Sequence, residues 1–177
     1  MTSLPNLPTP SASWIRTARL NLEPIRRVHA GVMYPILSDP NIYQFTGGSP
    51  PSSIETLAET YASWELRRSP DGKELWLNWL LREREKAAAI GSVQATIAEN
   101  CTYIAWMVGT QWQRRGYASE AASALVRWLL ALGPGEIRAR VNPCHTASQI
   151  VAGRAGLRRT EQLNAGEEVW VLNRPPN

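Results

Sequence analysis

The stretch "TYIAWMVGTQWQRRGYASEAASALVRWLL", residues 102–130, joins an apolar run, a cationic turn and an amphipathic segment. Residues 102–109 are nearly all apolar, which predicts a strand buried on both faces. After the turn, apolar side chains recur on one side of a predicted helix, at Ala121, Leu125, Trp128, Leu129 and Leu132. Between strand and helix lies Gly116, which follows Arg114 and Arg115. Because glycine carries no Cβ and tolerates positive φ, the backbone there can approach a ligand closely.

This turn has the features of a phosphate site. The start of a helix presents unpaired backbone N–H groups and the positive end of the helix dipole, and both attract anions. Arg114 and Arg115 add positive charge. The alternative interpretation is a solvated loop that only begins the helix. Neither a Walker A sequence nor a G-x-G-x-x-G pattern occurs, which argues against nucleoside triphosphates and dinucleotides.

Hydrophobic periodicity predicts the order strand, two helices, three strands, helix, strand, helix, two strands. The predicted segments are 19–25, 26–39, 53–68, 74–83, 87–99, 102–109, 117–132, 136–142, 146–156, 157–163 and 167–173. Pro35 should shorten or kink the first helix, whose apolar side is formed by Val28, Val32, Ile36 and Leu37. Residues 102–141 then form one β-α-β crossover, which predicts an α/β fold with a mixed sheet and helices on both faces.

The composition predicts one globular domain, because 44% of the 177 residues are hydrophobic and 19% are charged. Residues 1–13 should form a mobile, proline-rich tail and residues 14–177 the domain. A net charge of +4, without basic runs interleaved with aromatics, permits an anionic ligand and predicts no nucleic-acid partner. No apolar run approaches the ~20 residues of a membrane span.

Cysteine and histidine usage bears on the compartment and on metals. Cys101 and Cys144 form no CxxC pair, which predicts reduced thiols in a cytoplasmic protein, although one disulfide stays an alternative. With His29 and His145 as the two histidines, no cluster has metal-ligand spacing, so no metal is expected.

The run "QRRGYA", residues 113–118, resembles the Q/R-x-x-G-x-G/A signature of the GNAT acyltransferase superfamily. Further stretches resemble, in order, the RimJ/RimL-type branch of that family: "TARLNLEPI", "LSDPNIYQFTGG", "IGSVQATI", "WMVGTQWQRRGYASEA" and "VNPCHTASQIVAGRAGLRRT". The resemblance covers roughly residues 17–160. It implies a GNAT-like fold with mostly antiparallel N-terminal strands and a splayed parallel central pair, and acetyl-CoA as co-substrate.

The resemblance also implies which residues bind acetyl-CoA. The backbone of Met107 and Val108 should hydrogen-bond the pantetheine arm. The strand over residues 137–141 should splay from the strand that ends at Val108, leaving a V-shaped slot. The pyrophosphate should lie on the N–H groups of Gln113, Arg114, Arg115, Gly116, Tyr117 and Ala118. Positioning is then the largest aid to transfer, supported by backbone donors for the oxyanion.

In this branch the helix after the slot opens with N-x-x-S, whose serine lies near the CoA sulfur; here the run is "HTAS". Ser148 is therefore expected to donate to the departing thiolate, the alternative being a surface hydroxyl. His145 replaces the asparagine. It either takes part in proton transfer, since histidine titrates near neutrality, or keeps one donor to the cofactor arm, or caps the helix. The tyrosine acid of other branches is absent, because its position holds Ala152.

The sequence offers several alternatives for the general base that deprotonates the amine. Many relatives carry glutamate where this chain has Tyr103, and a tyrosine is a poor base at neutral pH. The alternatives are Glu99 or another carboxylate, a water chain, or an amine that arrives neutral. Tyr103, Trp106 and Trp112 are expected on the acceptor side.

The resulting hypothesis is an N-acetyltransferase acting directly on a primary amine, either a protein N-terminal α-amine or a small molecule. An aminoglycoside-type antibiotic is one alternative and would need several carboxylates near the mouth of the site. The candidates are Asp39, Glu55, Glu59, Glu65, Asp71 and Glu83. An alternative of another class is a non-catalytic acyl-CoA-binding module. The protein is expected to be a monomer or homodimer.

Overall fold

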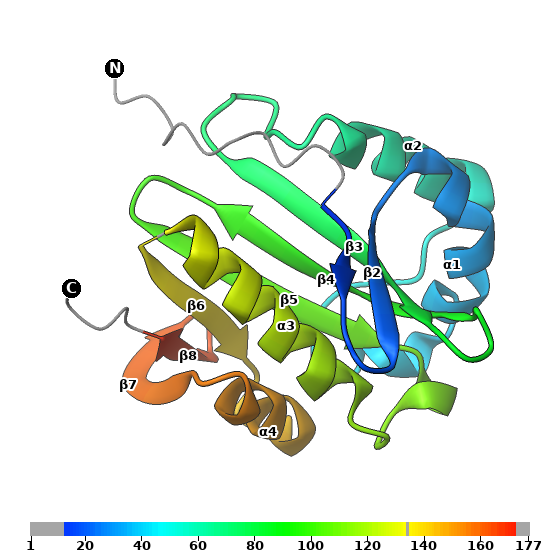
Figure 1. The fold of residues 1–177 in the computed structure, drawn as a ribbon. Helices are drawn as coiled ribbons and strands as arrows, with labels where there is room; N and C mark the ends of the chain where they lie inside the picture. Colours follow the sequence, from blue (N-terminus) through cyan, green and yellow to red (C-terminus); the bar gives the residue numbers. More distant parts are fainter. Residues whose placement is uncertain (1–12, 134, 173–177) are drawn as a thin grey trace.

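The computed structural model describes residues 13–133 and 135–172, so the predicted tail lies outside the described residues except for Ser13. One eight-stranded sheet runs through the molecule in the order β1-β2-β3-β4-β5-β6-β8-β7 (Figure 1). Its strands are β1 (Ile15–Arg16), β2 (Leu20–Pro24), β3 (Leu75–Glu83), β4 (Ala89–Ile97), β5 (Cys101–Val108), β6 (Glu136–Val141), β7 (Arg158–Asn164) and β8 (Glu167–Leu172). The helices are α1 (Ala30–Leu37), α2 (Ile54–Glu65), α3 (Tyr117–Leu132) and α4 (Thr146–Arg154).

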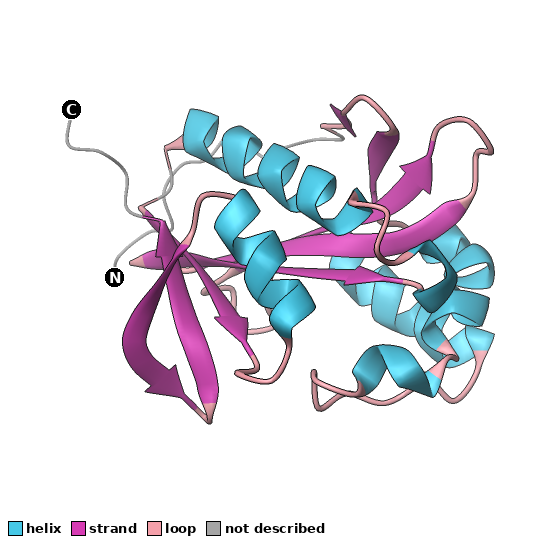
Figure 2. Ribbon diagram, turned by 90° about the horizontal axis from the view of Figure 1, so that it is seen from below, coloured by secondary structure: helices cyan, strands magenta, loops and turns pink. Residues whose placement is uncertain are grey.

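The predicted order of elements is confirmed, as are the α/β class and the mixed sheet. Helices α3 and α4 cover one face of the sheet and α1 and α2 the other (Figure 2). Short elements escaped the sequence analysis because they have too few residues for a periodicity. They are β1 and the 3₁₀ turns η1 (Arg27–His29), η2 (Pro40–Tyr43) and η3 (Thr110–Trp112).

Each face has its own apolar core. Leu125 and Leu129 of α3 are fully buried in the core between α3 and the sheet, and Tyr61 of α2 is buried in the same core as Met33 of α1. Burying one such leucine side chain stabilises the fold by about 1.5–3 kcal/mol. The two cores hold the sheet in place from both sides.

The predicted apolar face of the first helix is wrong in part. Val28 and Val32 are 74% and 48% exposed, whereas Met33 and Ile36 are buried. The reason is that Val28 lies in the 3₁₀ turn η1, so the α-helical phase begins only at Ala30. The helix is short and contains Pro35, as expected.

The prediction that residues 102–109 are buried on both faces is also wrong. Thr102, Ile104 and Val108 of β5 are buried, but Ala105 is exposed and Met107 half-buried. One face of β5 packs against the core under α3, while the other borders a cleft. The apolar side chains on that second face therefore line a cavity rather than a core.

Strands β5 and β6 form the parallel pair of the sheet, and they separate after a short stretch. Their pairing is limited to Cys101–Tyr103 against Glu136–Arg138. Beyond it, β5 stays paired with β4 up to Val108, and β6 stays paired with β8 up to Val141. The predicted splay is thus present, and it opens a V in the middle of the sheet.

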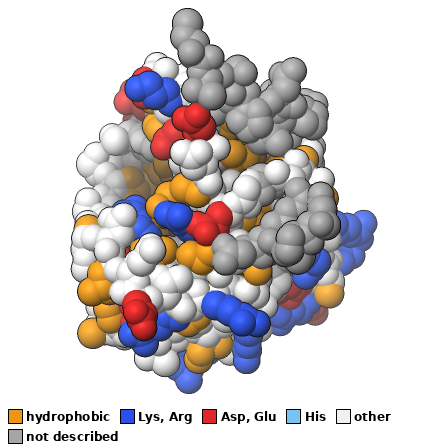
Figure 3. All heavy atoms as spheres, turned by 90° about the vertical axis from the view of Figure 1, so that its left-hand side faces the viewer, with side chains coloured by type: hydrophobic (Ala, Val, Ile, Leu, Met, Phe, Trp, Pro, Cys, Tyr) orange, Lys and Arg blue, Asp and Glu red, His pale blue; other side chains and the backbone are white. Residues whose placement is uncertain are grey.

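The outer surface shown in Figure 3 carries both signs of charge, with Lys and Arg side chains interspersed among Asp and Glu side chains. Among the described residues, every helix is too short or too polar to cross a bilayer.

Gly91 of β4 is predicted to be indispensable for the pairing with β5, because a Cβ there would collide with the carbonyl oxygen of Met107. Gly91→Ala should lower the free energy of unfolding by about 1–3 kcal/mol. Chemical denaturation monitored by circular dichroism measures the loss. The control is Gly31→Ala in α1, where a Cβ would meet nothing within 4 Å. It should leave stability unchanged or raise it by about 0.5–1 kcal/mol. Equal stabilities of the two variants would contradict the steric argument.

Candidate active site

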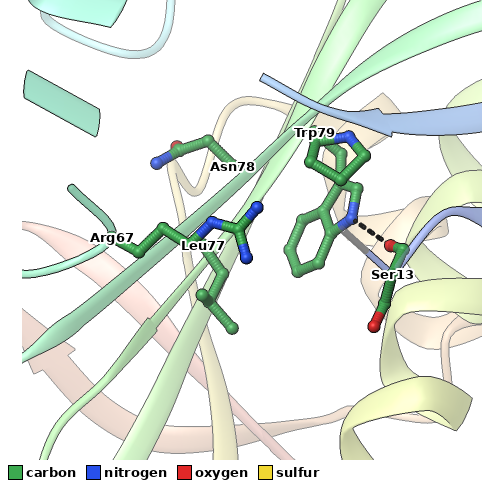
Figure 4. Close-up of a pocket in the computed structure, with 6 residues that line it drawn as sticks. Ser13, Arg67, Leu77, Asn78 and Trp79 are labelled. Atoms are coloured by element: carbon green, nitrogen blue, oxygen red, sulfur yellow. Dashed lines mark hydrogen bonds between the residues drawn. The ribbon is translucent and has the colours of Figure 1, made fainter. Parts of the chain in front are cut away.

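A cleft of about 830 Å³ passes through the V between β5 and β6. This volume is within the range of about 300–1,000 Å³ that small-molecule sites occupy. The wall is formed by β4, β5 and β6, by Glu167 of β8, by the start of α4, and by residues 37–64 on the side of α1 and α2. A second cavity, at β3, holds only about 10 Å³, room for about one water. There Trp79 donates to the carbonyl oxygen of Ser13 at 3.1 Å (Figure 4).

The edge of β5 that faces the V can be identified from its hydrogen bonds. The Gly109 N–H donates to the Ile90 carbonyl at 2.9 Å, and the Ala98 N–H donates to the Cys101 carbonyl at 3.0 Å. In an antiparallel pair, residues whose N–H and C=O groups bond the partner strand alternate with residues whose groups point away from it. Odd-numbered residues of β5 therefore pair with β4, and the backbone groups of even-numbered residues point into the V.

The main-chain groups that face the slot are thus those of Ile104, Trp106 and Val108. The main chain of Met107 faces β4, because its carbonyl oxygen lies where a Cβ of Gly91 would be. The sequence prediction gave Met107 the same role as Val108, and the structure separates them. The carbonyl oxygen of Val108 already accepts a hydrogen bond of 2.9 Å from the side-chain amide of Gln113.

The turn over residues 113–118, which we call the glycine turn, follows β5 after the short 3₁₀ turn η3 and has a left-handed backbone at two positions. Arg114 has φ 60°, and Gly116, the N-cap of α3, has φ 81°. No side chain caps this helix, and its first backbone bond runs from the Glu120 N–H to the Gly116 carbonyl at 3.0 Å. The amides of Tyr117 and Ala118 therefore have no acceptor among the described residues. Unpaired amides at a helix start, together with the positive end of the helix dipole, are the kind of donors that an anion can bind.

An ion pair, which we call the Arg19–Glu120 bracket, holds the turn from the side of β2. The Arg19 Nε donates to Glu120 Oε2 at 2.7 Å, and its Nη1 donates to the Arg115 carbonyl at 2.9 Å. The hydroxyl of Thr17 and the Arg19 N–H both donate to Glu120 Oε1, at 2.6 and 2.8 Å. The guanidinium also lies 4.6 Å from the centre of the Tyr117 ring. The turn is consequently shaped before any ligand arrives.

The sequence analysis missed this bracket, because its two residues are 101 positions apart along the chain. The available signal was the acidic Glu120 in the first turn of α3, where a negative charge complements the helix dipole. Burial raises the pKa of Glu120, but the hydrogen bonds from Thr17 and Arg19 outweigh it. The net effect is a pKa below the usual range.

Ser148 and Trp106 meet across the V. The indole N–H of Trp106 donates to Ser148 Oγ at 3.2 Å, which links β5 to the first turn of α4. A hydroxyl that accepts a hydrogen bond still has its own proton to donate. Ser148 is therefore held in the cleft with its O–H available to a ligand.

His145 lies beside Ser148 at the start of α4. Its ring stacks on Phe45, with ring centres 4.5 Å apart and an interplanar angle of 18°. Burial lowers its pKa, so the imidazole is neutral at pH 7. The expected alternative of a side-chain cap is not observed, since the His145 side chain makes no capping bond to α4.

The structure places the remaining predicted residues differently. Tyr103 lines the cleft at the closed end of the V, with the Arg140 guanidinium 5.8 Å from its ring centre. Trp112 packs on the core under α3, between Tyr117 and Arg115, and is not part of the cleft wall. Glu99 lies exposed in the turn between β4 and β5, at the opposite end of β5 from the glycine turn.

The carboxylates of the wall also differ from those considered in the sequence. None of the six acidic residues proposed for a polycationic acceptor lines the cleft. The carboxylate that lines the cleft belongs to Glu167 of β8. Its Oε2 lies 3.7 Å from the Nε of Arg140 in β6. No sequence signal distinguished Glu167 from other surface glutamates. Within the described residues, no three acidic, histidine or cysteine side chains gather as a metal site would require.

Comparisons with known proteins agree with this geometry. The model of the acetyltransferase (GNAT) domain family matches residues 19–158. The crystal structure of a GNAT-family acetyltransferase from Bacillus anthracis is similar, with TM-score 0.73 and 17% identity, covering 91% of this chain and 98% of that one. The ribosomal L7/L12 α-N-protein acetyltransferase RimL, solved with coenzyme A, has TM-score 0.76 and 16% identity over 91% and 98%.

A third similar structure is AAC(6')-Ib, an aminoglycoside acetyltransferase solved with acetyl-CoA, with TM-score 0.71 and 16% identity over 88% and 94% of the two chains. No curated protein sequence matches the chain significantly. At these identities the solved structures establish the shared fold.

The Arg19–Glu120 bracket predicts a pH-dependent stability. The folded-state pKa of Glu120 is lowered from its ordinary value of 4.5, so its contribution is complete above pH 4.5 and is lost as the pH falls through the folded-state value. Glu120→Gln should lower Tm by about 2–4 °C near neutral pH, and this difference from the wild type should shrink below pH 4.5. Thermal unfolding across pH measures it. Glu99→Gln, which removes one exposed charge, is the control, and a pH-independent difference for Glu120→Gln would contradict the assignment.

Proposed function

Because the chain belongs to the GNAT acetyltransferase family, we propose that it transfers the acetyl group of acetyl-CoA directly to the nitrogen of a primary amine. The observation that carries the proposal is the V between β5 and β6, which ends at the uncapped first turn of α3. RimL binds coenzyme A and AAC(6')-Ib binds acetyl-CoA on the same fold, which supports acetyl-CoA as the co-substrate here.

In this proposal the main chain binds the cofactor. The pyrophosphate is assigned to the backbone of the glycine turn, over Gln113, Arg114, Arg115, Gly116, Tyr117 and Ala118. The pantetheine arm is assigned to the free edge of β5, at Ile104, Trp106 and the N–H of Val108. An extended amide-bearing arm fits there because the V removes the neighbouring strand to which these groups would otherwise bond.

Ser148 is proposed to stabilise the thiolate. Bound acetyl-CoA supplies an activated acetyl group and a sulfur leaving group, and the sulfur needs a hydrogen-bond donor as it departs. Ser148 Oγ accepts from Trp106, so its own proton can be directed to the sulfur. Trp106 is then a positioning residue for that hydroxyl.

The role of general base, which accepts the proton of the attacking amine, is assigned to His145. The imidazole lines the cleft and is neutral at pH 7, which makes it able to accept a proton. Tyr103 lies in the cleft but is a poor base, and Glu99 lies outside it. The alternative is an amine that arrives neutral, which suits an α-amine with a pKa near about 8.

The acceptor is proposed to be a protein N-terminal α-amine or a small-molecule amine. RimL, the ribosomal-protein α-N-acetyltransferase, supports the first option, and AAC(6')-Ib supports an aminoglycoside. The aminoglycoside alternative lacks support from the wall of the cleft, where Glu167 is the lining carboxylate. The proposed setting is the cytoplasm, in which the free thiols of Cys101 and Cys144 stay reduced. A monomer or homodimer stays a prediction.

The proposal predicts thiol release from acetyl-CoA in the presence of a primary amine, and a dependence on the left-handed backbone of Gly116. A β-branched residue is strained at φ 81°, so Gly116→Val should raise KM for acetyl-CoA by about 10-fold or more while changing the KM for the amine little. Gly72→Val is the matched control, because Gly72 also has positive φ but lies in a turn away from the cleft. Equal effects on both KM values would count against the pyrophosphate assignment.

Binding of CoA without turnover of any amine would favour a non-catalytic module.

Ser148→Ala is predicted to lower kcat by about 10-fold or more, because the departing thiolate loses its donor, while the KM for acetyl-CoA changes less. Steady-state thiol release measures both parameters. Ser123→Ala is the control, since the Ser123 hydroxyl donates to the Arg154 carbonyl at the end of α4 and does not line the cleft. An unchanged kcat in Ser148→Ala would remove this residue from the mechanism.

A further inference from the structure

The part of the cleft on the side of α1 and α2, which we call the acceptor chamber, has a wall that is more apolar than polar, with hydroxyl and amide side chains among the apolar ones. Segments distant in sequence supply it, from residues 37–64, from the exposed face of β5 and from the neighbouring face of β4. Its apolar and aromatic members include Leu37, Tyr43, Phe45, Trp64 and Tyr103, with the buried Leu57 and Tyr61 also bordering it. Flat rings and aliphatic groups of this kind bind an apolar body by removing its surface from water.

The two tyrosines from residues 37–64 present little polar surface to the chamber. The Tyr43 hydroxyl donates to the Leu37 carbonyl at 2.9 Å, so Tyr43 presents its ring rather than its hydroxyl. Tyr61 is 1% exposed, and its ring lies 5.3 Å from that of Trp64. Burial raises the pKa of both tyrosines, which keeps them neutral.

Formal charge in the described wall is confined to one pair. Arg140 and Glu167 line the cleft and lie 3.7 Å apart, so their charges offset each other. The remaining lining residues are apolar, hydroxyl or amide side chains, together with the neutral His145. The chamber therefore offers an incoming cation at most one carboxylate.

The acidic residues within residues 37–65, which are Asp39, Glu55, Glu59 and Glu65, are not part of the wall. Asp39 accepts hydrogen bonds from Asn41 at 2.9 Å and from the Thr110 hydroxyl at 2.6 Å. Glu55 lies exposed in the first turn of α2 and is not part of the wall. A second or third ammonium on the acceptor would thus enter the chamber without a partner, and an unpaired desolvated charge is strongly unfavourable.

We infer that the acceptor is a monoamine, that is, one primary amine attached to an apolar, preferably aromatic, body with no second positive charge. This inference rests on the proposed function and narrows its acceptor. The same chemistry has two sources, a small arylalkylamine and a polypeptide whose first residue has an aromatic side chain. A polyamine or an aminoglycoside does not fit it.

The test is a binding measurement on the wild-type protein saturated with CoA. Calorimetry would compare 2-phenylethylamine, a short uncharged peptide amide that begins with phenylalanine, and spermidine. At least one of the two monoamines should bind about 10-fold more tightly than spermidine or better. Binding of the amine alone assigns a small molecule, and binding of the peptide alone assigns a polypeptide N-terminus.

The inference is overturned if spermidine binds as tightly as the better monoamine, or if neither monoamine binds. Because the readout is binding, it is independent of turnover. Loss of thiol release with the binding preference intact would contradict the proposed function and leave the acceptor chemistry standing.

A pair of variants tests the charge argument directly. Thr60→Glu places a carboxylate on the wall, since Thr60 lines the cleft from α2. Ser63→Glu, on the same helix but exposed and outside the wall, is matched in charge. Thr60→Glu should raise the affinity for spermidine by about 5-fold or more and leave 2-phenylethylamine within about 2-fold, whereas Ser63→Glu should change neither. Equal gains in both variants would show a general field effect and overturn the assignment to the chamber wall.

Discussion

The early end of the pairing between β5 and β6 is the constraint on which the rest of the molecule depends. A central strand normally has both edges bonded, because buried N–H and C=O groups without partners are costly. Here β5 is bonded to β4 along its length, but its other edge is bonded to β6 over three residues only, Cys101 to Tyr103. The remaining groups face an opening, so the fold itself provides the main-chain surface that an extended ligand can complete.

Two features keep this arrangement rigid. Gly91 allows β4 to approach β5 so closely that a side chain would collide with Met107. The Arg19–Glu120 bracket fixes the turn that follows β5, through the carbonyl of Arg115. The slot between β5 and β6 and the glycine turn are both formed by main-chain groups, so many different sequences can form them. This accounts for the persistence of the same fold in solved structures that share only 16–17% of their residues with this chain.

Local periodicity was enough to predict most of the fold, and the resemblance of residues 113–118 to a known signature supplied the splay. The errors occurred where tertiary structure decides. Val28 has helical spacing but lies in a 3₁₀ turn, and the apolar face of β5 borders a cleft that no pattern distinguishes from a core. Which residues of β5 turn their main chain to the slot depends on register with β4, so Met107 and Val108 could not be separated beforehand. The contacts of Arg19 with Glu120 and of Phe45 with His145 join residues about a hundred positions apart, and a single sequence carries no signal for them.

The stacking of Phe45 on His145 has a practical consequence for spectroscopy. Phe45 is the one phenylalanine of the chain, and its ring touches the imidazole at the junction between α4 and the aromatic wall. Biosynthetic incorporation of a singly fluorinated phenylalanine would therefore label this junction alone. Its one ¹⁹F resonance would need no assignment experiment. Changes in the surroundings of this ring would then be read from one line in a one-dimensional spectrum.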